Sequence, residues 1–368
     1  MEQTKLPGEA IRDQMQARGW TQRDLAEILG RPLPAVSEIL RGKRSLTPEM
    51  AVVLASAFGN DPEYWLRLEV AYRLGQIEKR NDDVARRAKL FEIAPVKDME
   101  RRGWIKKTET TEELEVELRR FYGVESLDQG PIITASFRKT ARDEPMSAEQ
   151  RAWCYRAKQL AQTVSAATYS DQAFDKGVKK LRRLVGWPEE AKEVSRILRE
   201  MGIRFVVVEH LPRTKIDGVA FWLSKDSPVI ALSIRFDRID SFWHTLGHEL
   251  SHIKHRDEPA VDTDIVGETR PLPPEQSAVE RRADDEAAEM WIDADELKSF
   301  IFRVGPLYSR SRINQFANRL VVHPGIIVGQ LQYRGELGYQ VLRDTLVKVR
   351  NIVISEALAD GWGQAACL

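Results

Sequence analysis

Cysteine is scarce in this chain of 368 residues, which contains only Cys154 and Cys367. Two cysteines cannot build a four-cysteine zinc site, and their scarcity favours a reducing compartment over a disulfide-stabilised secreted fold. Long apolar runs are also missing, since no stretch of about 18 apolar residues occurs and none follows the first residues. We therefore expect no signal peptide, no membrane span and a cytoplasmic location.

Net charge is absent as well, because 56 Lys and Arg residues balance 56 Asp and Glu residues. No global field draws such a protein to nucleic acid, so any DNA binding must depend on a local basic patch. With 42% hydrophobic and 30% charged residues, the composition is typical of globular proteins. The length suits two or three domains.

Histidine is rare too, with six residues, yet two of them stand in the string His248-Glu249-Leu250-Ser251-His252. On a helix, residues four apart share one face, so both imidazoles can bind the same metal ion. Glu249 lies about 100° round the helix, where it can act as a general base. This H-E-x-x-H spacing is typical of zinc metallopeptidases. We predict that His248 and His252 are metal ligands and that Glu249 is catalytic.

A third ligand is offered by Glu280, which with Asp284 forms an E-x-x-x-D pattern on a second predicted helix. Glu280 would complete a His-His-Glu set, which leaves a fourth position open for water and accepts Zn²⁺ or Mn²⁺. Asp284, one turn on, could hydrogen-bond the outer nitrogen of one of the two histidines. Glu275 and Glu286 are alternative ligands. A solvated charged helix face is the competing interpretation.

Strand patterns precede the predicted metal-binding helix, which we place at residues 241–255. Residues 205–208 are predicted to form a buried strand, and the apolar runs 219–223 and 229–232 to form a hairpin. Metallopeptidases often hold a peptide as an added strand along such an edge. An ordinary core hairpin is an equally good interpretation.

The first eighty residues are predicted to be helical, with helices at 10–18, 22–29 and 34–40. Thr21 is a suitable N-cap for the second helix, and Gly30 supplies the left-handed turn that ends it. This order predicts a helix-turn-helix bundle of the phage-repressor type, whose third helix enters the major groove of DNA. A helical bundle that serves only protein contacts is the alternative.

Candidate DNA contacts lie on and around the second and third helices. Arg41, Lys43 and Arg44 are placed to meet phosphates, which provide affinity without reading the sequence. Arg31 and Ser37 are candidates for hydrogen bonds to bases. The full set of predicted DNA-binding residues is Gln22, Arg31, Ser37, Arg41, Lys43 and Arg44.

The N-terminal segments TQRDLAE (21–27), SEILRGKR (37–44), TPEMA (47–51) and YWLRL (64–68) resemble the HigA-type antitoxins of the Xre class. The resemblance covers about residues 9–74. It implies a homodimer that binds an inverted-repeat operator in double-stranded DNA, a toxin partner, and autoregulation.

The segments IDGVAFW (216–222), RFDRIDSFW (235–243), the H-E-x-x-H string and ERRAD (280–284) resemble the ImmA/IrrE family of bacterial metallopeptidases. Several members of that family cleave a partner repressor. The resemblance implies that His248, His252 and Glu280 bind zinc, that Glu249 is the base, and that the protein comes from a bacterium or phage.

Taken together, the sequence predicts a mainly α protein with a small α+β zincin-like domain and an N-terminal helix-turn-helix bundle. We expect a DNA-binding domain at 1–76, a helical connector at 77–200, a metallopeptidase core at 201–300 and a helical region at 301–368. The last helix is expected at 341–358, and residues 309–331 have a weak second helix-turn-helix pattern.

The expected function is that of an antitoxin-like transcriptional regulator with a zinc-dependent endopeptidase domain. Its substrate would be a protein: a repressor, a component of a toxin system, or the chain itself. The alternative is a DNA-binding antitoxin or repressor whose metallopeptidase-like domain is only a sensor or a partner-binding module.

Overall fold

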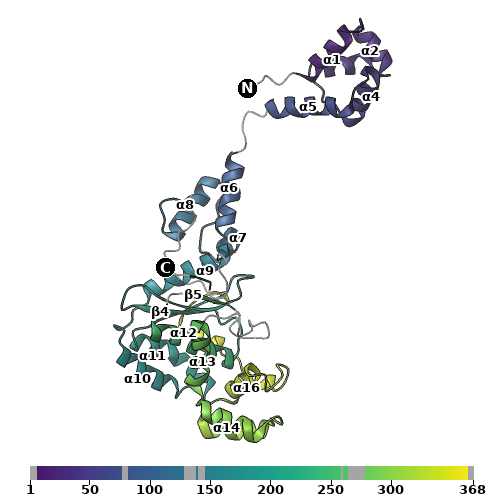
Figure 1. Cartoon of the computed structure of the whole chain (residues 1–368). Helices are drawn as coiled ribbons and strands as arrows, with labels where there is room; N and C mark the ends of the chain where they lie inside the picture. Colours follow the sequence, from purple (N-terminus) through teal and green to yellow (C-terminus); the bar gives the residue numbers. More distant parts are fainter. Residues whose placement is uncertain are drawn as a thin grey trace. The chain divides into compact units, whose positions relative to one another are not determined.

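The computed structural model describes residues 6–76, 82–127, 138–139, 146–257, 260–263 and 278–363. The chain divides into two compact units, Met1–Ala85 and Arg86–Leu368 (Figure 1). Most of the regular structure is helical, and the second unit also holds a small mixed sheet. None of the described helices is both long enough and apolar enough to span a membrane.

The first unit is a helical bundle, as predicted. Its helices are α1 (Pro7–Gln16), α2 (Gln22–Ile28), α3 (Leu33–Leu40), α4 (Pro48–Phe58) and α5 (Pro62–Gln76). Thr21 and Asp24 form a reciprocal capping box at the start of α2. Apolar side chains from all five helices form one core, which includes Ile11, Leu25, Leu40, Leu54 and Trp65.

The second unit is built on a six-stranded sheet with the order β1-β5-β3-β4-β2-β6. The strands are β1 (Arg138–Lys139), β2 (Arg204–Val208), β3 (Ile216–Trp222), β4 (Pro228–Leu232), β5 (Ala260–Thr263) and β6 (Leu358–Asp360). β3 and β4 form the predicted antiparallel hairpin, and β2 is the predicted buried strand. Of the two interpretations of this hairpin, the pairing favours the ordinary core hairpin, because β5 pairs along the outer side of β3.

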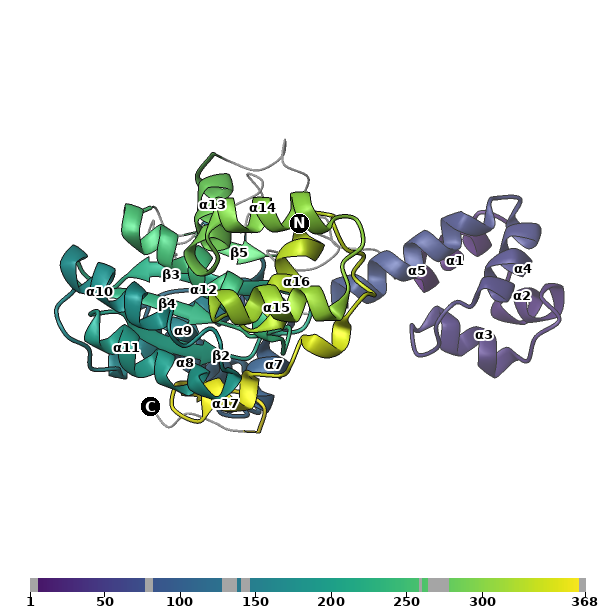
Figure 2. The same ribbon diagram turned by 90° about the horizontal axis from the view of Figure 1, so that it is seen from below.

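Helices cover both faces of this sheet (Figure 2). Alternate residues of β2 belong to two different cores: Phe205 and Val207 to one, Val206 and Val208 to the other. This alternation follows from the two-residue period of a strand. One layer contains α6 (Asp82–Ile93), α7 (Val96–Arg101), α8 (Thr111–Tyr122) and α9 (Ala148–Thr163).

The other layer carries most of the later helices. Its elements are α10 (Asp171–Leu181), η1 (Pro188–Glu193), α11 (Val194–Glu200), α12 (Ile239–His255), α13 (Ala278–Trp291), α14 (Ala294–Val304), α15 (Arg310–Leu320), α16 (Pro324–Tyr333), η3 (Arg343–Thr345) and α17 (Arg350–Ile354). Both layers and the sheet thus form a single packed unit.

The predicted domain boundaries can be set beside these two compact units. The division between the units falls within α6, after Ala85, and the predicted boundaries at 200 and 300 lie inside the second unit. Residues 77–200 are not a mere connector, because the buried Trp153 of α9 donates a hydrogen bond to the carbonyl oxygen of Val208 at 3.0 Å. Sequence periodicity alone could not show that these helices bury their apolar faces on the later strands.

One prediction about the C-terminal region is wrong. Residues 341–358 form η3, α17 and the start of β6 rather than one helix, since β6 pairs with β2 and the Asp237 carboxylate accepts hydrogen bonds from the backbone of Val349 and Arg350. The weak helix-turn-helix pattern at 309–331 corresponds to α15 and α16, and α16 is buried in the same core as α12.

Candidate functional site

The predicted metal-binding residues lie where two helices of the second unit cross closely. α12 is buried along nearly its whole length, with Phe242, Trp243 and Leu246 in the core. Gly247 faces α13, and a Cβ there would lie only 3.2 Å from the Cα of Ala287. Small residues at the crossing let the helices approach until side chains from both reach one point.

His248 and His252 of α12 and Glu280 of α13 meet at that point. The Nε2 atoms of His248 and His252 are 3.0 Å apart. The Glu280 carboxylate lies 3.3 Å from His248 Nε2 and 3.8 Å from His252 Nε2. Zinc–ligand bonds of about 2.0–2.2 Å in a tetrahedral site would separate ligand atoms by roughly 3.3 Å. The three donors therefore fit around one cation, and all are buried.

The outer nitrogen of each histidine faces a carboxylate. Asp284 Oδ1 lies 3.0 Å from His248 Nδ1, which is the contact predicted from the sequence, and Asp257 Oδ2 lies 2.9 Å from His252 Nδ1. A neutral imidazole that donates its Nδ1 proton leaves Nε2 as an acceptor. Two acceptor nitrogens and a carboxylate at these distances repel one another unless a proton or a metal ion lies between them. The donor chemistry thus fits a divalent metal ion.

Glu249 is fully buried and lies between α12 and the sheet. A Cβ on Gly218 of β3 would lie 2.2 Å from Glu249 Oε1, so the absence of a side chain at residue 218 makes room for the carboxylate. The predicted catalytic base is therefore held on the strand side of the helix that carries both histidines.

Other candidates are placed differently from what the sequence suggested. His244 is 9% exposed, and its Nε2 lies 3.7 Å from Asp284 Oδ1. Glu286 contacts Ser251 and His255 instead of the three donors, so it is not an alternative ligand. Burial raises the pKa of Glu286, but the hydrogen bonds from His255 and Ser251 outweigh this and lower it. Glu275 lies outside the described residues.

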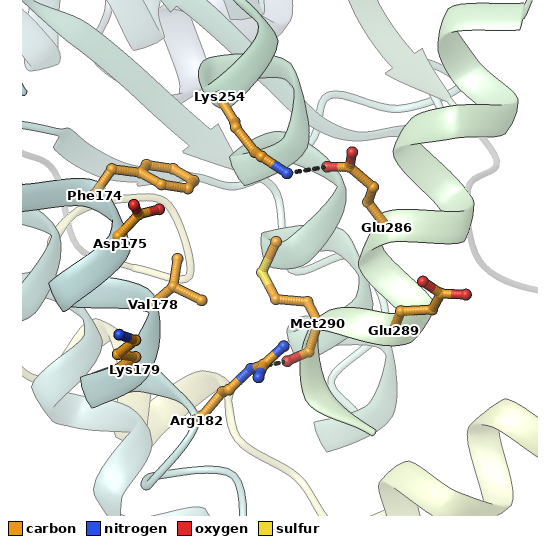
Figure 3. Close-up of a pocket in the computed structure, with 9 residues that line it drawn as sticks. All are labelled: Phe174, Asp175, Val178, Lys179, Arg182, Lys254, Glu286, Glu289 and Met290. Atoms are coloured by element: carbon orange, nitrogen blue, oxygen red, sulfur yellow. Dashed lines mark hydrogen bonds and ion pairs between the residues drawn. The ribbon is translucent and has the colours of Figure 1, made fainter. Parts of the chain in front are cut away.

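A surface cleft of about 470 Å³ lies beside this region, between α10, the end of α12 and α13 (Figure 3). Phe174, Val178 and Met290 are apolar residues of its lining, and charges of both signs surround them. Lys254 and Glu286 form an ion pair at 3.4 Å across one side of the cleft. The predicted metal donors are not among its described lining residues, so the cleft and the donor cluster are separate features.

The second candidate surface lies in the first unit, around α2 and α3. Gln22, Arg31 and Arg41 are exposed, as are Lys43 and Arg44, whereas Ser37 is half-buried. Arg12 of α1 donates a hydrogen bond at 2.7 Å to the carbonyl oxygen of Leu40, which fixes the end of α3 against the bundle. The basic residues after α3 therefore project from a rigid base into solvent.

Comparison with known proteins identifies this arrangement. A family model described as Helix-turn-helix matches residues 11–65. The chain is 34% identical over 76 residues to the Uncharacterized HTH-type transcriptional regulator YddM of Escherichia coli (strain K12), and the match covers 21% of this chain and 81% of that protein. The chain belongs to the helix-turn-helix family.

Two further relatives of the helix-turn-helix unit carry antitoxin names. Antitoxin HigA-1 of Vibrio cholerae serotype O1 is 35% identical over 72 residues, which cover 20% of this chain and 68% of that protein. A solved structure of an addiction module antidote protein of a HigA family from Coxiella burnetii is 36% identical, covers 20% of this chain and 79% of that chain, and gives a TM-score of 0.19. The helix-turn-helix model and the two curated relatives support an antitoxin-like, DNA-binding domain in the first unit.

Several residues of the candidate site were missed at the level of sequence. Asp257 contacts His252 and Arg282 contacts Asp257, but the sequence gives no signal for Asp257 and no role for Arg282 within the ERRAD segment. Gly218 was part of a quoted motif, and only its approach to Glu249 reveals why glycine is needed there.

Proposed function

We propose that this helix-turn-helix regulator is also a zinc-dependent endopeptidase whose site lies in the second unit. The observation that carries the proposal is the buried His248, His252 and Glu280 cluster, with Asp284 and Asp257 on the outer nitrogens of its histidines. Such carboxylate–histidine pairs are typical of metal sites, where they fix the ring orientation.

In this proposal each residue has a defined task. His248, His252 and Glu280 hold Zn²⁺ or Mn²⁺, and Asp284 and Asp257 keep the Nε2 atoms directed at it. The bound ion would polarise a scissile carbonyl and lower the pKa of water towards about 7. The Glu249 carboxylate takes a proton from the attacking water and passes it to the leaving amine. Burial of Glu249 excludes bulk water from this transfer.

The partners we propose follow from the first unit and its relatives. The helix-turn-helix unit binds an inverted-repeat operator as a homodimer, with Arg31 and Ser37 at the bases and Arg41, Lys43 and Arg44 at phosphates. The names of the antitoxin relatives support a toxin-system protein as the partner. The substrate is that partner, a repressor, or the chain itself.

One observation favours a second function for the same unit. β5 pairs along β3 beside Gly218, on the edge where an extended peptide would add as a strand. Because β5 already pairs along this edge of β3, the edge is not open to a substrate strand. This favours a domain that senses or binds a partner without cleaving it. In that case the metal cluster has a structural role only.

Substitution of Glu249 by Gln separates these functions. We expect the Glu249→Gln variant to bind DNA from upstream of its own gene like the wild type, to retain metal, and to lose cleavage of casein and of its own chain. The matched control is Glu289→Gln, which changes an exposed residue of α13. This variant should cleave casein and its own chain like the wild type. Equal cleavage by both variants, or no cleavage by the zinc-loaded wild type, would leave the partner-binding function.

A further inference from the structure

The end of α12 folds back towards its own histidine. Arg256 has a left-handed backbone with φ of 53°, so the chain reverses immediately after the helix. The Asp257 amide donates a hydrogen bond to the carbonyl oxygen of His252 at 3.1 Å, and its carboxylate lies 2.9 Å from His252 Nδ1. The group that orients His252 therefore belongs to a turn rather than to a helix.

Arg282 ties this turn to the other helix of the site. Its Nη2 donates to Asp257 Oδ2, the same oxygen that faces His252. Arg282 belongs to α13, two residues after the metal donor Glu280. The side chains of Asp257 and Arg282 are 12% and 34% exposed, so this charge-assisted bond is partly shielded from solvent.

The two histidines are thus oriented in different ways. His248 meets Asp284, which is itself on α13, so a regular helix fixes its carboxylate. His252 meets Asp257 on the turn after α12, and the bond from Arg282 connects that carboxylate to α13. Without this bond, the position of Asp257 relative to Glu280 would depend on the conformation of the turn.

We propose that Arg282 is a positioning residue for the metal site, which acts through Asp257 on the ring of His252. The proposal rests on the metal-binding part of the proposed function and adds a residue of this chain to it. Loss of an outer partner of a metal-bound histidine typically weakens metal affinity about 10–100-fold. Because Arg282 contacts Asp257 rather than His252 itself, we expect its substitution to weaken metal affinity about tenfold.

The test compares Arg282→Gln, Arg282→Lys and Arg281→Gln with the wild type, all as full-length chains. Arg281 is the adjacent, exposed arginine of α13, so its substitution removes the same charge while Arg282 is kept. Zinc affinity is measured by competition with a chelator, and the visible absorption bands of the Co²⁺-loaded proteins report the ligand geometry. Thermal unfolding of the metal-free proteins checks that each variant folds.

Arg282→Gln should bind zinc about tenfold more weakly and change the Co²⁺ spectrum, Arg282→Lys should restore most of the affinity, and Arg281→Gln should match the wild type. Wild-type affinity and spectrum in Arg282→Gln would overturn the inference and leave the proposed function intact. An equal loss in Arg281→Gln would also overturn it, because a general charge effect would then suffice. A wild-type protein that binds neither ion would contradict the proposed function itself.

Discussion

The two units of this chain place their function-bearing residues in opposite environments. In the first unit, Arg31, Arg41 and Lys43 project into solvent from a small apolar core. In the second unit, Glu249 and the three proposed metal donors are 7% exposed or less. Exposed side chains can reach DNA directly, whereas the proposed metal donors are held in place by the surrounding core. The proposed DNA-contacting side chains therefore lie outside the core of the first unit, whereas the proposed metal donors are part of the core of the second.

The largest effect is expected when the second unit alone is disturbed, by Gly218→Ala. The added Cβ would lie 2.2 Å from Glu249 Oε1, so the carboxylate must move while the helices stay packed. A displacement of about 1 Å can cost about 100-fold in rate. We expect casein hydrolysis to fall by about that factor, with zinc content and DNA binding unchanged.

Gly338→Ala is the control for this substitution, because a Cβ there meets its nearest atom only at 3.9 Å. It should be as active as the wild type. Full activity of Gly218→Ala would show that Glu249 is not held against β3 during hydrolysis.

A smaller effect, confined to the first unit, is expected from the double substitution Arg41→Ala with Lys43→Ala. If both side chains meet phosphates, the slope of log affinity against log salt concentration should fall by about 2. Binding to DNA from upstream of the protein's own gene is measured at several salt concentrations, and zinc content should stay unchanged.

The control for that variant removes two exposed cations from the second unit, as Lys176→Ala with Arg334→Ala. Its salt dependence should equal that of the wild type. If both double variants lower the slope equally, the DNA contacts are not concentrated after α3.

The smallest effect is expected at His323, which caps α16 by accepting a hydrogen bond from the Gly325 amide at Nδ1, 3.1 Å away. Burial lowers the pKa of His323 below its usual value of 6.5, so the folded protein favours the neutral ring. The cap's stabilisation is therefore present above that value and is lost as the pH falls through the lower, folded pKa. His323→Ala should lose about 1 kcal/mol of unfolding free energy at pH 7.5.

Asn can cap the helix without titrating, so His323→Asn serves as the comparison. Urea unfolding at pH 7.5 and 5.5 should show His323→Asn gaining on the wild type as the pH falls. A constant difference between the two proteins would mean that the cap does not titrate.

The same contrast explains how far the sequence could predict this molecule. The helix-turn-helix unit and the helix around His248 are encoded by neighbouring residues, so their patterns predicted them correctly. Glu280 and Asp284 were predicted because they repeat a helical spacing. Asp257 could not be, since its approach to His252 depends on a left-handed turn at Arg256, a residue type with no preference for that conformation.

Long-range packing accounts for the other failures. The amphipathic pattern of residues 341–358 predicted a helix, but Ala359 and its neighbours pair with β2, which is distant in sequence. The helices before residue 200 were interpreted as a connector because their partner, the sheet, is formed by later residues. Tertiary contacts decided both cases over local preference.

The central claim is that the second unit holds a metal ion between His248, His252 and Glu280. Elemental analysis of the purified wild type, the variant His248→Ala with His252→Ala, and the control His255→Ala tests it most directly. His255 lies on the same helix but contacts Glu286 instead of the donor cluster. We expect about one zinc or manganese ion per chain in the wild type and the control, and none in the double variant. No metal in the reconstituted wild type, or equal metal in all three proteins, would contradict the account.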